Sequence, residues 1–236
     1  MSPTDTVVCP QPLTLTAFIP MTKAFIFDLD GVIVDTAKYH YLAWKRLANS
    51  LGFDFTEEDN EHLKGVSRIE SLKLILKLGS VELDQAAFDA ALVNKNGWYL
   101  EDINKIGPEE ILPGVSAFLS AARAKGIKTA LGSASKNAVL ILERIQLLDQ
   151  FDAIVDGNKV TNAKPDPEVF LNAARELGVD ASECLVFEDA VAGVQAALNA
   201  KMKVVGIGEP SVLGHANLVM PNFKDVTVDG LIAQVG

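Results

Sequence analysis

Residues 25–35 read FIFDLDGVIVD, and this stretch decides the fold because a buried strand ends there in an acidic turn. Its aromatic and β-branched start is typical of a strand covered on both faces, and Gly31 marks where the backbone turns away. Residues two apart on a strand point the same way, so Asp28 and Asp30 are expected to face one cavity at the carboxyl end of a central strand. Two aspartates after a strand are by themselves equally compatible with a solvated turn. The motifs in the rest of the chain must therefore decide between a turn and a functional site.

Composition limits the classes of function. The 236 residues are 49% hydrophobic, enough for a sizeable core, and the net charge of −10 argues against a nucleic-acid surface. No apolar run is long enough to span a membrane, and residues 1–20 lack the pattern of a signal peptide. Cys9 and Cys184 are too few and too distant in sequence for a disulfide framework. We therefore expect a cytoplasmic protein with an N-terminal extension at residues 1–20.

The chain from residue 36 to about 108 shows helical periodicity and no convincing strand. Gly52 is expected to end the first helix, and Thr56 followed by acidic residues predicts the start of the next. The predicted helices span residues 36–52, 57–68, 69–78 and 84–106. This stretch is predicted to form an all-helical cap, residues 36–108, inserted after the first strand.

Strands and helices alternate regularly after Pro113. The predicted strands are residues 127–131, 153–155, 184–187, 203–206 and 218–220, in addition to 25–27. This alternation is the signature of parallel βαβ units with right-handed crossovers. The predicted fold class is α/β, with a doubly wound, Rossmann-like parallel-sheet core formed by residues 21–35 and 109–236.

Polar side chains follow several of these strands at what should be one edge of the sheet. Ser133 could bind an anion or cap a helix, and Lys164 could bind phosphate, hold two carboxylates apart or lie in solvent. Glu188 and Asp189, together with Asp28, are the hard oxygen donors that Mg²⁺ prefers, although a Glu-Asp pair alone is more often a helix start. The combination predicts a charged site that handles phosphate.

The motifs together resemble the haloacid dehalogenase superfamily of phosphoryl-transfer enzymes. They are DLDGVIVDT at residues 28–36, a serine after the next core strand, KPDP at 164–167 and ED at 188–189. The resemblance implies that Asp28 is the nucleophile that forms an aspartyl-phosphate and that Asp30 is the general acid and base. It also implies a Mg²⁺ cofactor held by Asp28, Asp30 through its carbonyl, Glu188 and Asp189, with phosphate bound by Ser133, Ala134, Lys164 and Asn137.

Within that superfamily the chain is most similar to the β-phosphoglucomutase group. The segments concerned are TAKYHYLAWKRLA at 36–48, LKGVSR at 63–68, NKN at 94–96 and SASKN at 133–137. This similarity implies an isomerase that interconverts β-glucose 1-phosphate and glucose 6-phosphate through a bisphosphate, as a monomer, with a small sugar phosphate as its partner. The implied substrate-binding residues are His40, Lys64, Gly65, Val66, Arg68, Ser71 and Lys95, with Thr36 at the hinge.

Other interpretations stay open at this stage. His40 could equally be a histidine that packs between helices, and Arg68 by itself would be read as a solvated helix-start residue. A phosphatase of the same fold, acting on sugar phosphates or phosphoglycolate, would share every core motif and differ only in the cap. A non-catalytic protein that binds phosphorylated ligands is a third alternative.

Overall fold

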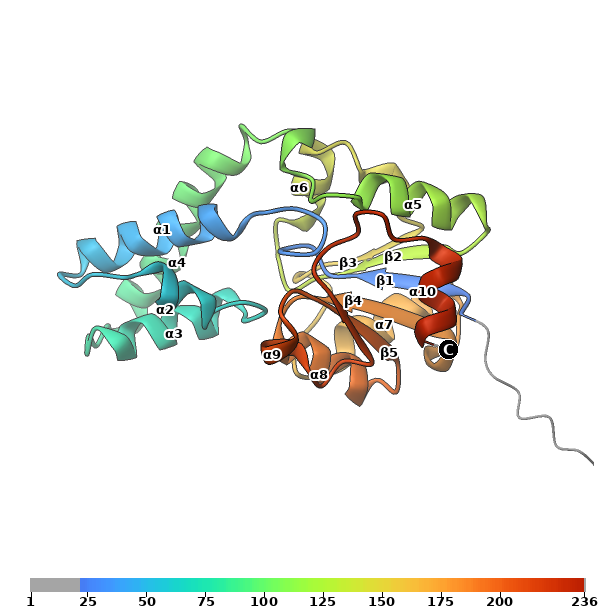
Figure 1. Cartoon of the computed structure of the whole chain (residues 1–236). Helices are drawn as coiled ribbons and strands as arrows, with labels where there is room; N and C mark the ends of the chain where they lie inside the picture. Colours follow the sequence, from blue (N-terminus) through green and yellow to red (C-terminus); the bar gives the residue numbers. More distant parts are fainter. Residues whose placement is uncertain (1–21, 236) are drawn as a thin grey trace, which may run out of the picture.

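The computed structural model describes residues 22–235, which form a parallel sheet flanked by helices, with a separate group of helices to one side (Figure 1). The predicted extension at residues 1–20 lies outside the described residues. The strands are β1 (Ala24–Phe27), β2 (Lys128–Gly132), β3 (Ala153–Val155), β4 (Cys184–Glu188), β5 (Lys203–Ile207) and β6 (Leu218–Met220), in the order β3-β2-β1-β4-β5-β6. All neighbours are parallel, so the α/β prediction is confirmed.

Helices cover both faces of the sheet, which explains why β1 is apolar at every position. Phe25 and Phe27 pack into one apolar cluster with the aromatic rings of Phe118 and Phe187, whereas Ile26 faces a second cluster on the other side. The helices of this core are α5 (Val115–Ala124), α6 (Ala138–Arg144), α7 (Glu168–Leu177), α8 (Val191–Asn199), α9 (Pro210–Leu213) and α10 (Val228–Val235), with short 3-10 turns at Pro108–Glu110, Leu148–Gln150 and Ala181–Glu183.

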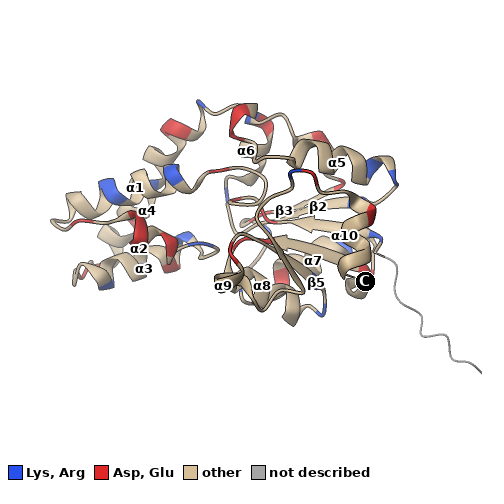
Figure 2. Cartoon of the chain, viewed as in Figure 1, with Lys and Arg blue, Asp and Glu red and all other residues tan. Residues whose placement is uncertain are grey.

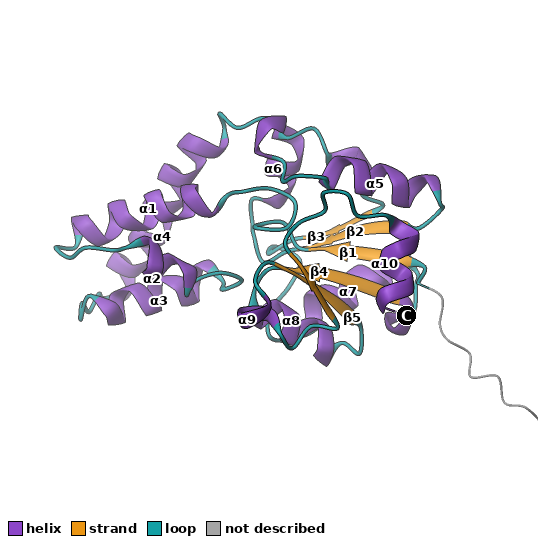
Figure 3. Cartoon of the chain, viewed as in Figure 1, coloured by secondary structure: helices purple, strands orange, loops and turns teal. Residues whose placement is uncertain are grey.

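The other helices form a group with its own apolar core, which we call the cap. They are α1 (Ala37–Ser50), α2 (Glu57–Glu61), α3 (Arg68–Leu78) and α4 (Gln85–Ile103), and Figure 3 shows only helices and loops there. Trp44, Phe55 and Leu72 are among the buried residues that hold them together. The helical character agrees with the sequence prediction, while the domain boundaries at 36 and 108 stay a prediction.

The predicted helix at residues 57–68 is wrong in its length. Thr56 caps α2 as expected, because its hydroxyl accepts from the Asp59 amide and the Asp59 carboxylate accepts from the Thr56 amide. The helix nevertheless ends at Glu61. Gly65 then has a φ of +71°, a left-handed conformation that a continuing α-helix cannot contain. Residues 62–67 are therefore a loop, and Arg68 begins the next helix, α3.

The cap is attached to the core by two connections that lie side by side. Val34 in the first forms an antiparallel bridge with Ile111 in the second, and the Asp35 amide donates to the Glu110 carbonyl over 3.1 Å. The Glu110 carboxylate also accepts from Lys38 over 2.7 Å. The entry and exit of the cap are thus joined by backbone and side-chain hydrogen bonds.

Charged residues are distributed over both parts, and Figure 2 shows Lys and Arg interspersed with Asp and Glu on the helices. None of the helices within residues 22–235 has the length and apolar character needed to cross a membrane. Cys184 is buried with a free thiol.

Candidate active site

The register of the sheet brings the predicted strand-end residues together. Phe27 pairs with Leu131 on one side and with Phe187 on the other, so Asp28 follows β1 at the level of Glu188. The Asp28 amide extends this ladder by donating to the Phe187 carbonyl over 2.9 Å. Ser133 lies directly after β2 at the same edge. Parallel pairing therefore assembles groups that are more than 150 residues apart in the sequence.

Lys164 forms the ionic centre of this edge. Its ammonium group lies 2.5 Å from a carboxylate oxygen of Asp28 and 2.5 Å from one of Glu188, and its side chain is 1% exposed. Burial disfavours the charged amine, but the charges of Asp28 and Glu188 outweigh that effect and raise the pKa of Lys164. The second Glu188 oxygen accepts from the Ala190 amide over 2.8 Å. Lys164 is thus a permanent cation that orients Asp28.

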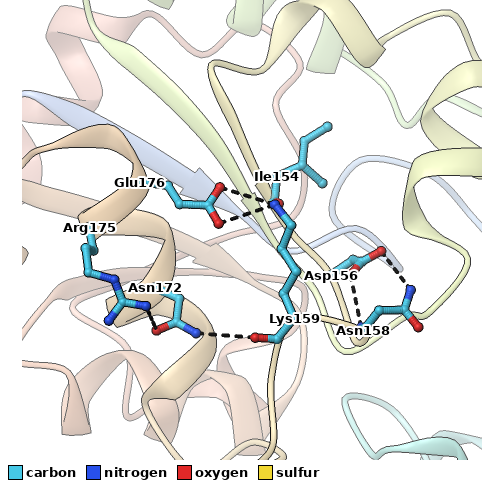
Figure 4. A network of polar contacts seen from close by, with 7 residues as sticks. All are labelled: Ile154, Asp156, Asn158, Lys159, Asn172, Arg175 and Glu176. Atoms are coloured by element: carbon cyan, nitrogen blue, oxygen red, sulfur yellow. Dashed lines mark hydrogen bonds and ion pairs between the residues drawn. The ribbon is translucent and has the colours of Figure 1, made fainter.

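The loop that ends at Lys164 is fixed from behind by polar side chains. In Figure 4, Lys159 reaches a backbone carbonyl of β3 over 2.6 Å and the Glu176 carboxylate on α7 over 3.3 Å. Glu168, also on α7, accepts from two consecutive backbone amides of the loop over 3.0 and 2.7 Å. These contacts satisfy the loop's backbone and restrain the position from which Lys164 enters the site.

Asp30 is held by the first residue of the cap connection. Thr36 occupies the N-cap position of α1, yet its hydroxyl donates to the Asp30 carboxylate and makes no capping bond. The His40 Nε2 atom lies 4.0 Å from the same carboxylate. Burial, together with the negative charge of Asp28, raises the pKa of Asp30 to about 6, while the Thr36 hydrogen bond opposes the shift. A carboxyl group with this pKa can both donate and accept a proton near neutral pH.

A cluster of basic side chains faces Asp30 from the cap. Lys95 on α4 lies 2.9 Å from the Nδ1 atom of His40 and is almost fully buried. Burial and the charge of Arg68 lower the pKa of Lys95 to about 7, and burial with the charges of Lys95 and Arg68 lowers that of His40 well below its usual value. His40 is therefore neutral at physiological pH, and its Nδ1 atom can accept a hydrogen bond from Lys95.

A cavity of about 350 Å³ between the core and the cap contains most of the predicted site residues. Its lining includes Asp28, Asp30, His40, Lys64, Gly65, Val66, Arg68, Ser71, Lys95, Ser133, Ala134, Asn137 and Asp189. Lys164 and Glu188 lie behind Asp28, and Thr36 lies behind Asp30, so these three act through their contacts with the lining. Gly65 is required in the cap loop, because a Cβ there would lie 2.8 Å from the Ala190 side chain.

Several lining residues were not predicted from the sequence. Ser135 and Lys136 lie inside SASKN, between residues that were predicted, so the motif itself carried the signal. Thr161 and Asn162 come from the loop before Lys164, and neutral residues in a loop give no comparable signal. Trp44 is buried and also borders the cavity. Lys136, in the loop after β2, adds a lysine of the core to the cations that line the cavity from the cap.

The acidic groups at the sheet edge fit a hard divalent cation in their chemistry. Burial and the charges of Glu188 and Asp28 raise the pKa of Asp189 well above its usual value, as expected for crowded carboxylates. Gly31 allows this crowding, because a Cβ there would lie 2.1 Å from an Asp189 oxygen. Within residues 22–235 no three acidic, histidine or cysteine side chains are already arranged as metal ligands. Asp28 and Asp189 line the cavity, and Glu188 lies next to Asp28 with one hydrogen bond on each carboxylate oxygen.

The structure places the chain among α/β proteins with a charged site at the carboxyl ends of the strands, and sequence comparison specifies the family. The profile of the haloacid dehalogenase-like hydrolases matches residues 22–201. The chain belongs to this family.

Within this family the chain is similar to both mutases and phosphatases. The chain is 43% identical to a β-phosphoglucomutase of Bacillus subtilis (strain 168), over 88% of this chain and 92% of that protein. A crystal structure of β-phosphoglucomutase from Clostridium difficile superposes with a TM-score of 0.88 at 41% identity, covering 91% of this chain and 97% of that one. A fructose-1-phosphate phosphatase of Escherichia coli (strain K12) is 32% identical over 77% of this chain and 94% of that protein. Both mutases and phosphatases are thus among its relatives.

Proposed function

We propose that this protein is a β-phosphoglucomutase, which interconverts β-glucose 1-phosphate and glucose 6-phosphate through a bisphosphate and an aspartyl-phosphate on Asp28. One observation of the site carries the proposal. The Arg68 guanidinium lines the cavity without an acidic partner among residues 22–235, whereas the cation near Asp28, Lys164, is already paired. An unpaired arginine suits a second phosphate, because its planar fork binds phosphate oxygens bidentately. The high identity to a mutase supports the same conclusion.

The first chemical step follows from the core residues. An Asp28 oxygen attacks the phosphorus atom, and the bond between phosphorus and the sugar oxygen breaks. Lys164 holds the other Asp28 oxygen, and Ser133 lies beside the site of transfer to bind a phosphoryl oxygen. Asp30, with a pKa of about 6, donates its proton to the sugar oxygen that leaves.

The second step reverses the proton transfer. Asp30, now a carboxylate, accepts the proton of the 6-hydroxyl of a bound β-glucose 1-phosphate, and that oxygen attacks the phosphorus atom of the aspartyl-phosphate, which releases Asp28 and forms the bisphosphate. The bisphosphate must then turn around, so that Arg68 binds the 6-phosphate while the 1-phosphate faces Asp28 and is transferred in the next first step, which releases glucose 6-phosphate. The cavity meets this requirement, because Asp28 lies at its core side and Arg68 at its cap side.

The cap would favour a sugar over water as the acceptor. Arg68, Lys64 and Ser71 border the cavity from the cap, and the core contributes Asp28 and Ser133. A sugar phosphate that contacts both parts would stabilise their approach and displace water from Asp30. Water alone cannot bridge the two parts in this way.

We also propose Mg²⁺ as the cofactor, with Asp28, Glu188, Asp189 and the Asp30 carbonyl as the groups that would hold it. When bound, the ion supplies charge neutralisation for the anionic nucleophile and the phosphoryl oxygens. The crowding that raises the pKa of Asp189 is the observation that supports a cation here.

A coupled assay tests the proposed reaction. The purified protein is given β-glucose 1-phosphate, Mg²⁺ and a trace of glucose 1,6-bisphosphate, and glucose 6-phosphate and inorganic phosphate are measured in parallel. Formation of glucose 6-phosphate well above phosphate release is the expected result. Stoichiometric release of phosphate would instead identify a sugar-phosphate phosphatase, the activity named for several relatives.

A further inference from the structure

Asp156 is a buried carboxylate that the proposed reaction does not use. It follows β3 directly, is 6% exposed and forms no ion pair among residues 22–235. Both of its oxygens accept from Asn158 over 3.0 Å, one from the backbone amide and the other from the side-chain amide (Figure 4). A buried carboxylate is costly unless its oxygens are hydrogen-bonded. Here Asn158 supplies these bonds, and its side chain is thereby held in one orientation.

The side chain of Asn158 extends from this turn to the loop after β2. Its amide group also donates to the Lys136 carbonyl over 3.0 Å, and the backbone amide of Gly157 donates to the Ser135 carbonyl over 3.1 Å. Two consecutive carbonyls of the loop are therefore held by two consecutive residues of the turn. The contact is close, because a Cβ at Gly157 would lie 2.2 Å from the Ala134 carbonyl oxygen.

The loop held in this way, residues 133–137, borders the cavity with every one of its residues. In a planar trans peptide the C=O and N–H bonds point in opposite directions, so fixing the Ser135 carbonyl also fixes the Lys136 amide. That amide donates to no acceptor among residues 22–235. A carbonyl turned toward a bound anion would repel it, whereas a free amide can donate to a phosphate oxygen. The hydrogen bonds from the turn thus leave the loop with a donor for phosphate.

We propose that Asn158 is a positioning residue, which holds the Lys136 carbonyl while Gly157 holds the preceding one, so that the amide between them can donate to a phosphate group of the substrate. Asn158 itself does not border the cavity, so it acts through the loop. Asp156 supports this role, because it binds the side chain that reaches the loop. The inference deepens the proposed function and rests on its phosphorylated substrate, whether the phosphoryl group then passes to a sugar or to water.

Titration of the full-length protein with inorganic phosphate, in the presence of Mg²⁺, tests the proposal with Asn158→Ala. Following the Lys136 amide signal by NMR restricts the measurement to this loop and excludes phosphate bound at Arg68. In the wild type, phosphate should shift the Lys136 amide proton downfield, as expected for a donor to an anion. Asn158→Ala should reduce that shift and raise the dissociation constant of phosphate about fivefold, which corresponds to the loss of one hydrogen bond.

Asn172→Ala is the matched control. The Asn172 side chain donates to the Lys159 carbonyl over 3.5 Å, so it also binds a backbone carbonyl of the segment between β3 and α7 but none of the 133–137 loop (Figure 4). This variant should leave the dissociation constant unchanged. A merely structural role for Asn158 would lower the midpoint of thermal unfolding and leave phosphate binding by the folded protein unchanged. That result, or equal losses of affinity in the two variants, would overturn the proposal.

Gly157→Ala tests the turn independently of the Asn158 side chain. The added Cβ would lie 2.2 Å from the Ala134 carbonyl oxygen, so the loop must move. The dissociation constant of phosphate should rise by about tenfold, because this displacement disturbs both held carbonyls. Wild-type affinity in Gly157→Ala would contradict the role of the turn.

Steady-state kinetics separate phosphate binding from chemistry. In the proposed reaction, Asn158→Ala should raise KM for β-glucose 1-phosphate about fivefold and change kcat less than about twofold, because the loop binds phosphate alike in the ground state and the transition state. A fall in kcat with unchanged KM would contradict the proposal. If the wild-type protein releases only phosphate from sugar phosphates, the mutase proposal fails, while the phosphate titration still decides the role of Asn158.

Discussion

The core and the cap contribute to one cavity by different physical means. In the core, Asp28 follows β1, Glu188 ends the neighbouring strand β4, and the charges of both are compensated by Lys164 without any substrate. In the cap, Arg68 and Lys95 come from helices and carry charges that are unpaired or suppressed by burial. The charges of the core are thus compensated within the protein, whereas the cations of the cap can be compensated by a bound anion.

This difference predicts that the two parts of the site respond differently to substitution. A paired, buried charge network resists change, because altering one member leaves the others uncompensated. Cap residues on helix starts and loops carry no such constraint. Substitutions in the core should impair phosphoryl transfer or stability, whereas substitutions in the cap should impair the use of sugar phosphates.

The largest effect is expected for Asp28→Asn in the core. Without the nucleophile, transfer from both glucose 1,6-bisphosphate and acetyl phosphate should fall by at least about 10⁴-fold. Phospho-enzyme formation followed by mass spectrometry checks this directly. A variant that retained acetyl-phosphate hydrolysis would show that the core and cap do not divide the work as described.

Lys164→Met should affect folding as well as catalysis. Removing the ammonium group leaves the Asp28 and Glu188 carboxylates buried beside each other, and breaking a buried ion pair in this way costs about 3–5 kcal/mol. Urea unfolding monitored by circular dichroism measures the loss. The control is Lys38→Met, whose exposed ion pair with Glu110 should change the unfolding free energy by less than about 1 kcal/mol. Similar losses in the two variants would contradict the contrast.

Arg68→Ala should damage only the response to a second phosphate. Mutase turnover should fall by about 100-fold, in line with the loss of a charge-assisted, bidentate contact, while hydrolysis of acetyl phosphate should change less than threefold. Steady-state kinetics with both substrates make the comparison. Equal losses would place Arg68 in the phosphoryl-transfer step and remove the basis for the mutase proposal.

The smallest effect concerns the pH dependence of stability at Lys95. Its pKa is about 7 in the folded protein, against about 10.4 in an unfolded chain, so between these values the unfolded state binds an extra proton. The stability of the wild type relative to Lys95→Met should therefore fall as pH decreases from 9.5 to 7, on the order of 2 kcal/mol, and level off below pH 7. Urea unfolding at pH 6, 7 and 9.5 checks this, and a difference independent of pH would show that Lys95 stays protonated throughout.

Sequence patterns were sufficient to predict where the strands lie along the chain. The six strands begin and end within one or two residues of the predicted positions, because each is a short apolar run bounded by polar or glycine residues. The cap helices were also predicted, apart from the ends of α2 and α4, which stop at Glu61 and Ile103. After α2 the local pattern favoured a longer helix, whereas Gly65 in the loop that follows is left-handed and lies beside Ala190. A tertiary contact of that kind leaves no trace in helical periodicity.

The sequence by itself determined which groups are available: carboxylates after β1 and β4, a serine after β2, a lysine before Pro165, and an arginine at the start of α3. Tertiary structure alone decided their partners. It placed Lys164 between Asp28 and Glu188 and diverted the Thr36 hydroxyl from its helix to Asp30. The physical reason is that periodicity and propensity depend on neighbours along the chain, whereas charge compensation and hydrogen bonding depend on distances set by sheet register and helix packing.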